Sequence, residues 1–257
     1  MVLNRWFDSH CHLDFSQLAG QLPQVLARAR MQGVVQFVVP GVKASHWPRV
    51  LALTSEPGVS VACGIHPWFV AEHQQSDLEV LGARLGDSDC VAVGECGLDY
   101  ARKEVNRDVQ RFFFDAQLKL AQQHRLPVIV HACRALDDVL QMLACYPEVK
   151  AVLHGFSGSP EQALRACQAG HSLGIGGAVR RANHGKLRRV VREMPAGLML
   201  LETDAPEGVR EPGDANEPAL LVETAAVVAD LRQVSLPALS SQVMQNSLEF
   251  FGLSEVE

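Results

Sequence analysis

Near its start the chain contains the stretch Phe7-Asp8-Ser9-His10-Cys11-His12, in which two histidines follow a short apolar run. Successive side chains of a β-strand point to opposite faces, so we predict that His10 and His12 lie on one face of a strand and Cys11 on the other. Two imidazoles on one side of a strand can hold a single divalent metal ion. Paired histidines also occur by chance, so the meaning of this stretch depends on whether the pattern recurs.

The pattern does recur: four more apolar runs each end in one carboxylate or imidazole. These residues are Glu95 after 91–94, His131 after 127–130, His154 after 151–153 and Asp204 after 198–201. Each has an ordinary explanation by itself, because a histidine at a strand end is commonly a hydrogen-bonded structural residue and a carboxylate can cap the next helix. Their joint occurrence favours a metal site at the carboxyl ends of parallel strands, which is the catalytic face of a barrel.

Strand-like apolar segments alternate with amphipathic helical segments along the whole chain. Strands are predicted at 34–39, 59–67, 90–95, 127–131, 150–154, 171–175 and 198–202, and helices at 22–32, 47–53, 77–86, 105–125, 135–145, 160–168 and 184–194. Two further helices are predicted in 217–252, with a break near Pro237. Together with the first strand, this count predicts an α/β fold, a (β/α)₈ barrel of the TIM type. An open doubly wound sheet is the alternative, but it gives no reason for five strands to end in polar ligands.

Composition agrees with one large core, since the 257 residues are 47% hydrophobic and 20% charged. We expect residues 1–257 to form a single domain. The net charge of −6 argues against a broad basic surface for nucleic acid, although bound divalent cations would add positive charge locally.

Seven cysteines without a C-x-x-C pair predict free thiols in a reducing compartment. The chain has neither an apolar run of membrane-spanning length nor a signal-like N-terminus. We therefore expect a cytoplasmic, monomeric protein that does not bind a membrane.

Six side chains would converge at one end of the barrel: His10, His12, Glu95, His131, His154 and Asp204. Mixed imidazole and carboxylate ligands suit Zn²⁺, Mn²⁺ or related ions, and the lack of a cysteine cluster disfavours a closed structural zinc site. Six ligands exceed the needs of one catalytic metal, whereas two ions that share a bridging carboxylate would use all of them. The set therefore predicts two divalent cations (Zn²⁺, Mg²⁺ or Mn²⁺) that activate a water molecule.

Other catalytic motifs fit less well. Ser157 lies in Gly155-Phe156-Ser157-Gly158, which lacks the G-x-S-x-G spacing of a nucleophile elbow. The stretch Gly174-Ile175-Gly176-Gly177 follows a strand but lacks G-x-G-x-x-G spacing, so a tight turn is the simpler interpretation.

Eight stretches resemble, in this order, the motifs of the TatD family of metal-dependent deoxyribonucleases, within the wider amidohydrolase-like barrels. They are DSHCHL (8–13), GIHP (64–67), GECGLDY (94–100), QLKLA (117–121), LPVIVH (126–131), HGFSG (154–158), LETDAP (201–206) and NEP (216–218). The stretches span nearly the whole chain, and their combination is far more specific than any one of them.

The resemblance implies two metal sites that share one residue. One metal would be held by His10, His12, Glu95 and Asp204, and the other by Glu95, His131 and His154.

The resemblance also implies the catalytic roles. Glu95 would bridge the metals, and Asp204 would orient or deprotonate the attacking water. His66 would touch the phosphate or the leaving oxygen, although the residues alone explain it equally well as a structural histidine.

Three positions depart from the family pattern. The family often has His-x-Arg where this chain has His131-Ala132-Cys133, with Arg134 one place late. Strand alternation puts Cys133 on the ligand face, which weakens the candidacy of Arg134 as a phosphate-binding residue. Residues 211–215 are acidic where the family is often basic, which would repel a long polyanion, and Gly155 replaces a commoner cysteine.

Three functions are compatible with these residues. The first is a two-metal phosphodiesterase that trims the single-stranded ends of DNA, with flanking phosphates contacted by Arg180, Arg181, Lys186, Arg188 and Arg189. That basic run is otherwise an ordinary solvated helix face. The second function is hydrolysis of a small amide, lactone or phosphoester. The third is a metal-binding structural or sensing module, which the acid Asp204 beside an open ligand set disfavours.

Overall fold

The computed structural model describes residues 4–87, 90–102, 104, 106–208 and 216–255. In this part of the chain, eight parallel strands pair in sequence order, β1 with β2 through to β7 with β8. The strands are β1 (Trp6–Asp8), β2 (Val34–Pro40), β3 (Val59–Cys63), β4 (Cys90–Asp99), β5 (Val128–Cys133), β6 (Ala151–Leu153), β7 (Ser172–Ile175) and β8 (Met199–Leu201). The predicted (β/α)₈ barrel is confirmed.

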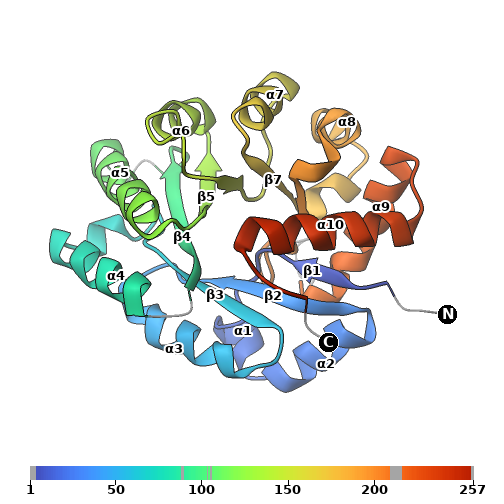
Figure 1. Cartoon of the computed structure of the whole chain (residues 1–257), viewed down its shortest axis with the longest axis horizontal. Helices are drawn as coiled ribbons and strands as arrows, with labels where there is room; N and C mark the ends of the chain where they lie inside the picture. The colour runs from blue at the N-terminus through green and yellow to red at the C-terminus, as the bar shows by residue number, and fades with distance from the viewer. Residues whose placement is uncertain (1–3, 88–89, 103, 105, 209–215, 256–257) are drawn as a thin grey trace.

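Helices lie mostly around the outside of the strands, and one of them crosses an end of the barrel (Figure 1). They are α1 (Ser16–Ala19), α2 (Leu22–Met31), α3 (Trp47–Leu51), α4 (Gln75–Asp87), α5 (Arg107–His124), α6 (Leu136–Leu143), α7 (Pro160–Gln168), α8 (Gly185–Glu193), α9 (Leu221–Arg232) and α10 (Leu236–Phe251). Local signals define several ends: Ser159 and Gln162 form a capping box at the start of α7, and Asn106 caps α5. None of the helices within these described ranges has the length and apolar character needed to cross a membrane.

The inside of the barrel is apolar at the end opposite the site. Seven strands contribute one residue each to a buried cluster: Phe7, Val38, Ala62, Ala92, Ile129, Val152 and Leu200. Side chains from so many strands can meet only in the lumen. Phe250 and Phe251 of α10 pack on this cluster, and Phe251 stacks on Phe7 with ring centroids 5.9 Å apart. Figure 1 shows α10 lying across this end of the barrel.

The seam between the first and last strands is closed just beyond their ends. Ser9 N–H donates to Leu201 O at 3.0 Å, and Asp204 N–H donates to His10 O at 2.9 Å. These bonds bring the residues that follow β1 and β8 together at one rim of the barrel.

Some predicted boundaries are wrong. Strands β4 and β5 continue past Glu95 and His131 to Asp99 and Cys133, so neither ligand closes its strand. The break in the C-terminal helices comes before Ser235, which caps α10, and Pro237 lies in the first turn of that helix. Proline is tolerated there because the first amides of a helix have no intrahelical acceptor. None of the seven cysteines, all of which lie in the described ranges, takes part in a disulfide bond.

Candidate metal centre

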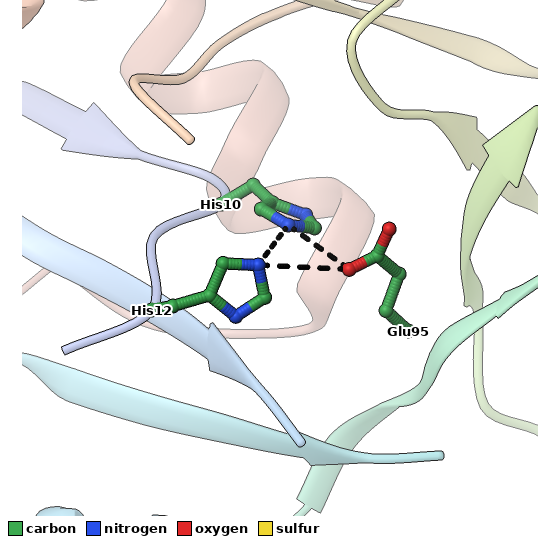
Figure 2. Close-up of side chains that lie close together, drawn as sticks. All are labelled: His10, His12 and Glu95. Carbon is green, nitrogen blue, oxygen red and sulfur yellow. Dashed lines mark hydrogen bonds and ion pairs between the residues drawn. The ribbon is translucent and has the colours of Figure 1, made fainter. Parts of the chain in front are cut away.

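The six predicted ligands converge at the carboxyl ends of the strands, but the first two reach this point differently from the prediction. Strand β1 ends at Asp8, so His10 and His12 lie in the following loop and not on one face of a strand. His12 N–H donates to Ala205 O at 2.6 Å, and His10 N–H to Asp8 Oδ1 at 3.3 Å. These bonds, and not strand alternation, turn both rings toward Glu95 (Figure 2).

One set of ligand atoms gathers around Glu95 Oε2. The Nε2 atoms of His10 and His12 lie 3.4 and 3.6 Å from Glu95 Oε2, and each is 3.6 Å from Asp204 Oδ1. The two Nε2 atoms are 3.2 Å apart. A tetrahedral site with bonds of about 2.0–2.2 Å separates its ligand atoms by about 3.3–3.6 Å. The spacing of His10, His12 and Glu95 is that of three ligands of one such cation, and Asp204 groups in the same way with His10 and His154.

A second set gathers around the other oxygen of the same carboxylate. Glu95 Oε1 lies 3.1 Å from His131 Nδ1, 3.1 Å from His154 Nε2 and 3.4 Å from His66 Nε2. Glu95 is 2% exposed, so both oxygens face protein groups in place of bulk water. The carboxylate joins two clusters, and the groups His10–His12–Glu95 and His66–Glu95–His131 could each hold a metal ion.

Two carboxylates lie behind the second set. His131 Nε2 is 3.2 Å from Asp99 Oδ2, and His154 Nδ1 is 3.3 Å from Glu202 Oε1. Metal-binding histidines commonly turn their outer nitrogen toward a carboxylate, which fixes the ring and its tautomer. Asp99 and Glu202 were assigned no role from the sequence, although both occur in the quoted family stretches. The contacts of Asp99 with His131 and of Glu202 with His154 depend on which strands are neighbours in the barrel.

His66 differs from the other histidines of the site. Its Nδ1 lies 3.1 Å from Trp68 N, an amide that can only donate, so Nδ1 is the acceptor. Burial lowers the pKa of His66 to about 4, so the ring is neutral and its proton is on Nε2. In this tautomer Nε2 carries the proton and donates toward Glu95, whereas a metal ion in the group His66–Glu95–His131 would require the other tautomer. This arrangement favours the predicted role of His66 as a donor to substrate over a role as ligand.

The charges of the acids reflect their surroundings. Burial alone would raise the pKa of Glu95, but the imidazoles of His66, His154 and His10 outweigh burial and hold that pKa well below its usual range. Burial raises the pKa of Asp204 to about 6. The two acids therefore differ: imidazole neighbours lower the pKa of Glu95, whereas burial raises that of Asp204.

Cavities on two sides of the ligands provide room for a substrate. One, of about 570 Å³, is lined by His154 together with Tyr100, Arg107 and Arg134. The other, of about 350 Å³, is lined by Asp204 and Arg181. Arg134 thus borders the site as part of the cavity wall. The residue close to the ligand His131 is Cys133, through its sulfur, as the strand alternation predicted.

Most of the predicted basic run makes contacts within the protein. Arg180 pairs with Glu223 at 2.8 Å, Arg189 pairs with Glu193 at 2.8 Å, and Arg188 donates to Val179 O at 2.9 Å. Lys186 is exposed, and Arg181 is the member that lines the cavity beside Asp204. The acidic segment 211–215 lies outside the described residues.

A family model described as TatD related DNase matches residues 7–252. The chain belongs to this TatD family. It is 34% identical to the uncharacterized metal-dependent hydrolase YjjV of Escherichia coli K12, over 98% of this chain and 100% of that protein. It is 36% identical to a protein of Pantoea sp. At-9b named 3'-5' ssDNA/RNA exonuclease TatD, over 96% of this chain and 100% of that protein.

A solved structure agrees with this membership. The crystal structure of the YjjV TatD homologue from Escherichia coli K12 superposes with a TM-score of 0.94 at 34% identity, over 98% of this chain and 100% of that one. TatD membership and the ligand clusters around Glu95 class the chain as a metal-dependent hydrolase.

Proposed function

We propose that this protein is a two-metal phosphodiesterase that removes nucleotides from single-stranded DNA ends in the 3'-5' direction, with residues 1–257 acting as one hydrolase domain. The proposal rests on one observation: the two carboxylate oxygens of Glu95 face different pairs of histidines. Oε2 faces His10 and His12, and Oε1 faces His131 and His154. The relatives named as 3'-5' ssDNA/RNA exonucleases support the choice of substrate.

The ligands are assigned by their distances to Glu95. The first cation would be held by His10, His12, Glu95 and Asp204, and the second by Glu95, His131 and His154. Two such ions, Zn²⁺, Mg²⁺ or Mn²⁺, supply a water of lowered pKa and neutralise charge on the scissile phosphate.

The remaining chemistry belongs to side chains of this chain. Asp204 accepts a proton from the attacking water, because its side chain lies beside His10 and His12 at the first ligand set. Its position is held by the bond from its own N–H to His10 O. The proton on His66 Nε2, which points toward Glu95, would be donated instead to an oxygen of the phosphate or of the leaving group when substrate binds. Arg134, on the wall of the larger cavity, offsets the charge of a phosphate there.

One observation favours a smaller substrate. Cys133, and not an arginine, lies beside His131 and Asp99. The second set of ligands therefore has a thiol at a position where a positively charged side chain would bind a polyanion better. The alternative function is therefore hydrolysis of a small phosphoester, amide or lactone by the same residues.

The test uses metal-loaded protein and a 5'-labelled single-stranded oligonucleotide. Expected is a ladder of products shortened from the 3' end with Mg²⁺, Mn²⁺ or Zn²⁺. Asp204→Asn should slow the reaction by about 10²-fold or more, whereas Asp230→Asn, at an exposed position on α9, should not. If the protein hydrolyses chromogenic small esters or cyclic amides but cleaves no DNA with any of the three metals, the nuclease function is wrong and the alternative function remains.

A further inference from the structure

Trp68 is a large aromatic side chain left partly exposed beside the candidate metal centre. It is 38% exposed and follows His66-Pro67 in the turn after β3. Its ring lies edge-on to His66, with centroids 4.9 Å apart, and 6.1 Å from the ring of His131. The other two tryptophans, Trp6 and Trp47, are each 2% exposed. Exposure of an indole is therefore particular to this rim of the site.

A hydrogen bond fixes the direction of this exposed ring. Trp68 Nε1 donates to Asp99 Oδ2 at 2.6 Å, and the same oxygen lies 3.2 Å from His131 Nε2. Asp99 also accepts from Ala101 N–H through its other oxygen, at 2.8 Å. The indole is thus held at a set position relative to the second ligand set, without being buried by apolar neighbours.

The guanidinium group of Arg102 lies over the face of this ring. Its guanidinium carbon is 3.9 Å from the indole centroid, and the side chain is exposed. A second pair of the same kind follows along the rim, where Arg107 lies 4.2 Å over the ring of Tyr100. Tyr100 and Arg107 line the larger cavity together with Arg134. Aromatic faces and guanidinium groups therefore alternate along one side of the site.

Building on the function proposed above, we propose that Trp68 and Arg102 form a platform on which an unpaired nucleobase of the substrate stacks while the scissile phosphate lies at Glu95. Indole and guanidinium planes are the surfaces on which proteins stack bases of single strands, and the arginine also contributes positive charge toward the backbone. A base inside a duplex has both faces covered by its neighbours. The platform thus selects unpaired ends and is indifferent to the identity of the base, because every base has a π-face.

A structural role makes a different prediction. If Trp68 served only to hold Asp99 and His131, its Nε1–H would matter and its flat face would not. Trp68→Phe keeps an aromatic face and loses the N–H, whereas Trp68→Ala loses both. Comparing the two variants separates stacking from support of the ligand.

The experiment measures binding, so that turnover is not the readout. Fluorescence anisotropy is recorded for metal-loaded full-length protein with two labelled phosphorothioate oligonucleotides of equal length, one normal and one abasic at its three 3'-terminal positions. Both ligands carry the same backbone charge, so the ratio of their dissociation constants isolates the bases. Phe112→Ala, which removes a 49%-exposed aromatic on α5 outside the site, is the control.

Wild-type protein and Phe112→Ala should bind the normal strand about tenfold or more tightly than the abasic strand. Trp68→Ala should reduce this ratio to near one, and Trp68→Phe should retain most of it. Quenching of tryptophan fluorescence by the normal strand, but not by a blunt duplex, should accompany binding to the wild type. An unchanged ratio in Trp68→Ala, or equal losses in both Trp68 variants, would overturn the platform.

The two proposals fail in different ways. If the wild type cleaves single-stranded DNA but Trp68→Ala keeps the normal-to-abasic ratio, the platform alone is wrong. If the wild type neither binds nor cleaves the normal strand, the proposed nuclease function is wrong, and the platform is rejected with it.

Discussion

Asp8 and Thr203 are 195 residues apart, yet the Asp8 carboxylate accepts two hydrogen bonds from Thr203. Thr203 Oγ1 donates to Asp8 Oδ2 at 2.5 Å, and Thr203 N–H donates to Oδ1 at 3.0 Å. Asp8 is fully buried at the end of β1, and Thr203 follows β8. The pair joins the two segments that carry His10 and Asp204. The contacts that close the barrel therefore also bring the residues of the first ligand set together.

Thr203→Val should destabilise the protein by about 1–3 kcal/mol, because it leaves Asp8 Oδ2 buried without its donor. Urea unfolding followed by circular dichroism measures this loss. Thr203→Ser, which keeps the hydroxyl, should lie closer to the wild type. Equal stability of the valine and serine variants would show that the hydroxyl contributes little.

Glu95→Gln should disrupt both ligand sets, since a neutral amide replaces the anion that faces the histidines of both sets, such as His10 and His131. We expect metal affinity to fall by about 100-fold or more, beyond the range typical of outer-shell partners. Metal content after dialysis, measured by mass spectrometry, should drop from two ions per chain to one or none. Glu193→Gln, on the surface of α8, is the matched control. Retention of two ions by Glu95→Gln would contradict the bridging role.

Gly174→Ala should weaken the second ligand set selectively. A Cβ at Gly174 would overlap Glu202 Oε2, and Glu202 lies behind His154. Displacement of Glu202 should lower the affinity for one of the two metals by about 10- to 100-fold and spare the other. Gly185→Ala is the control, because no atom lies within 4 Å of a Cβ built there. Sequential metal titration followed by calorimetry distinguishes loss of one site from loss of both.

His171 should make stability depend on pH. Burial lowers the pKa of this histidine from its ordinary value of 6.5. The unfolded chain therefore takes up a proton first as the pH falls, and stability is lost below about pH 6.5 until the lowered folded-state pKa is reached. His171→Gln should show a flatter decline than the wild type in urea midpoints between pH 7.5 and 5. Parallel declines would mean that other groups cause the dependence.

Much of the fold was predictable because it follows from local pattern. Apolar runs such as 128–130 and 151–153 became buried strands, and the helix predicted at 160–168 is α7. Boundaries at the site were less predictable. Glu95 and His131 have strand on both sides, since pairing between β4 and β5 extends the ladder to Asp99 and Cys133.

The outer residues of the site show the same limit. Asp99 and Glu202 act on histidines 32 and 48 positions away along the chain, and no local pattern connects them. The orientation of His66 depends on one amide, Trp68 N–H, which a sequence does not place.

By itself, the sequence predicted the barrel and the set of candidate ligands, because hydrophobic periodicity dictates the strands and parallel strands bring their carboxyl ends to one face. Only the tertiary structure decided which histidines each carboxylate oxygen of Glu95 faces and which nitrogen each histidine turns toward the site. It also decided which carboxylates contact the outer nitrogens of these histidines. Those outcomes depend on distances of 3–4 Å between residues far apart in the chain, and packing of the whole barrel sets such distances.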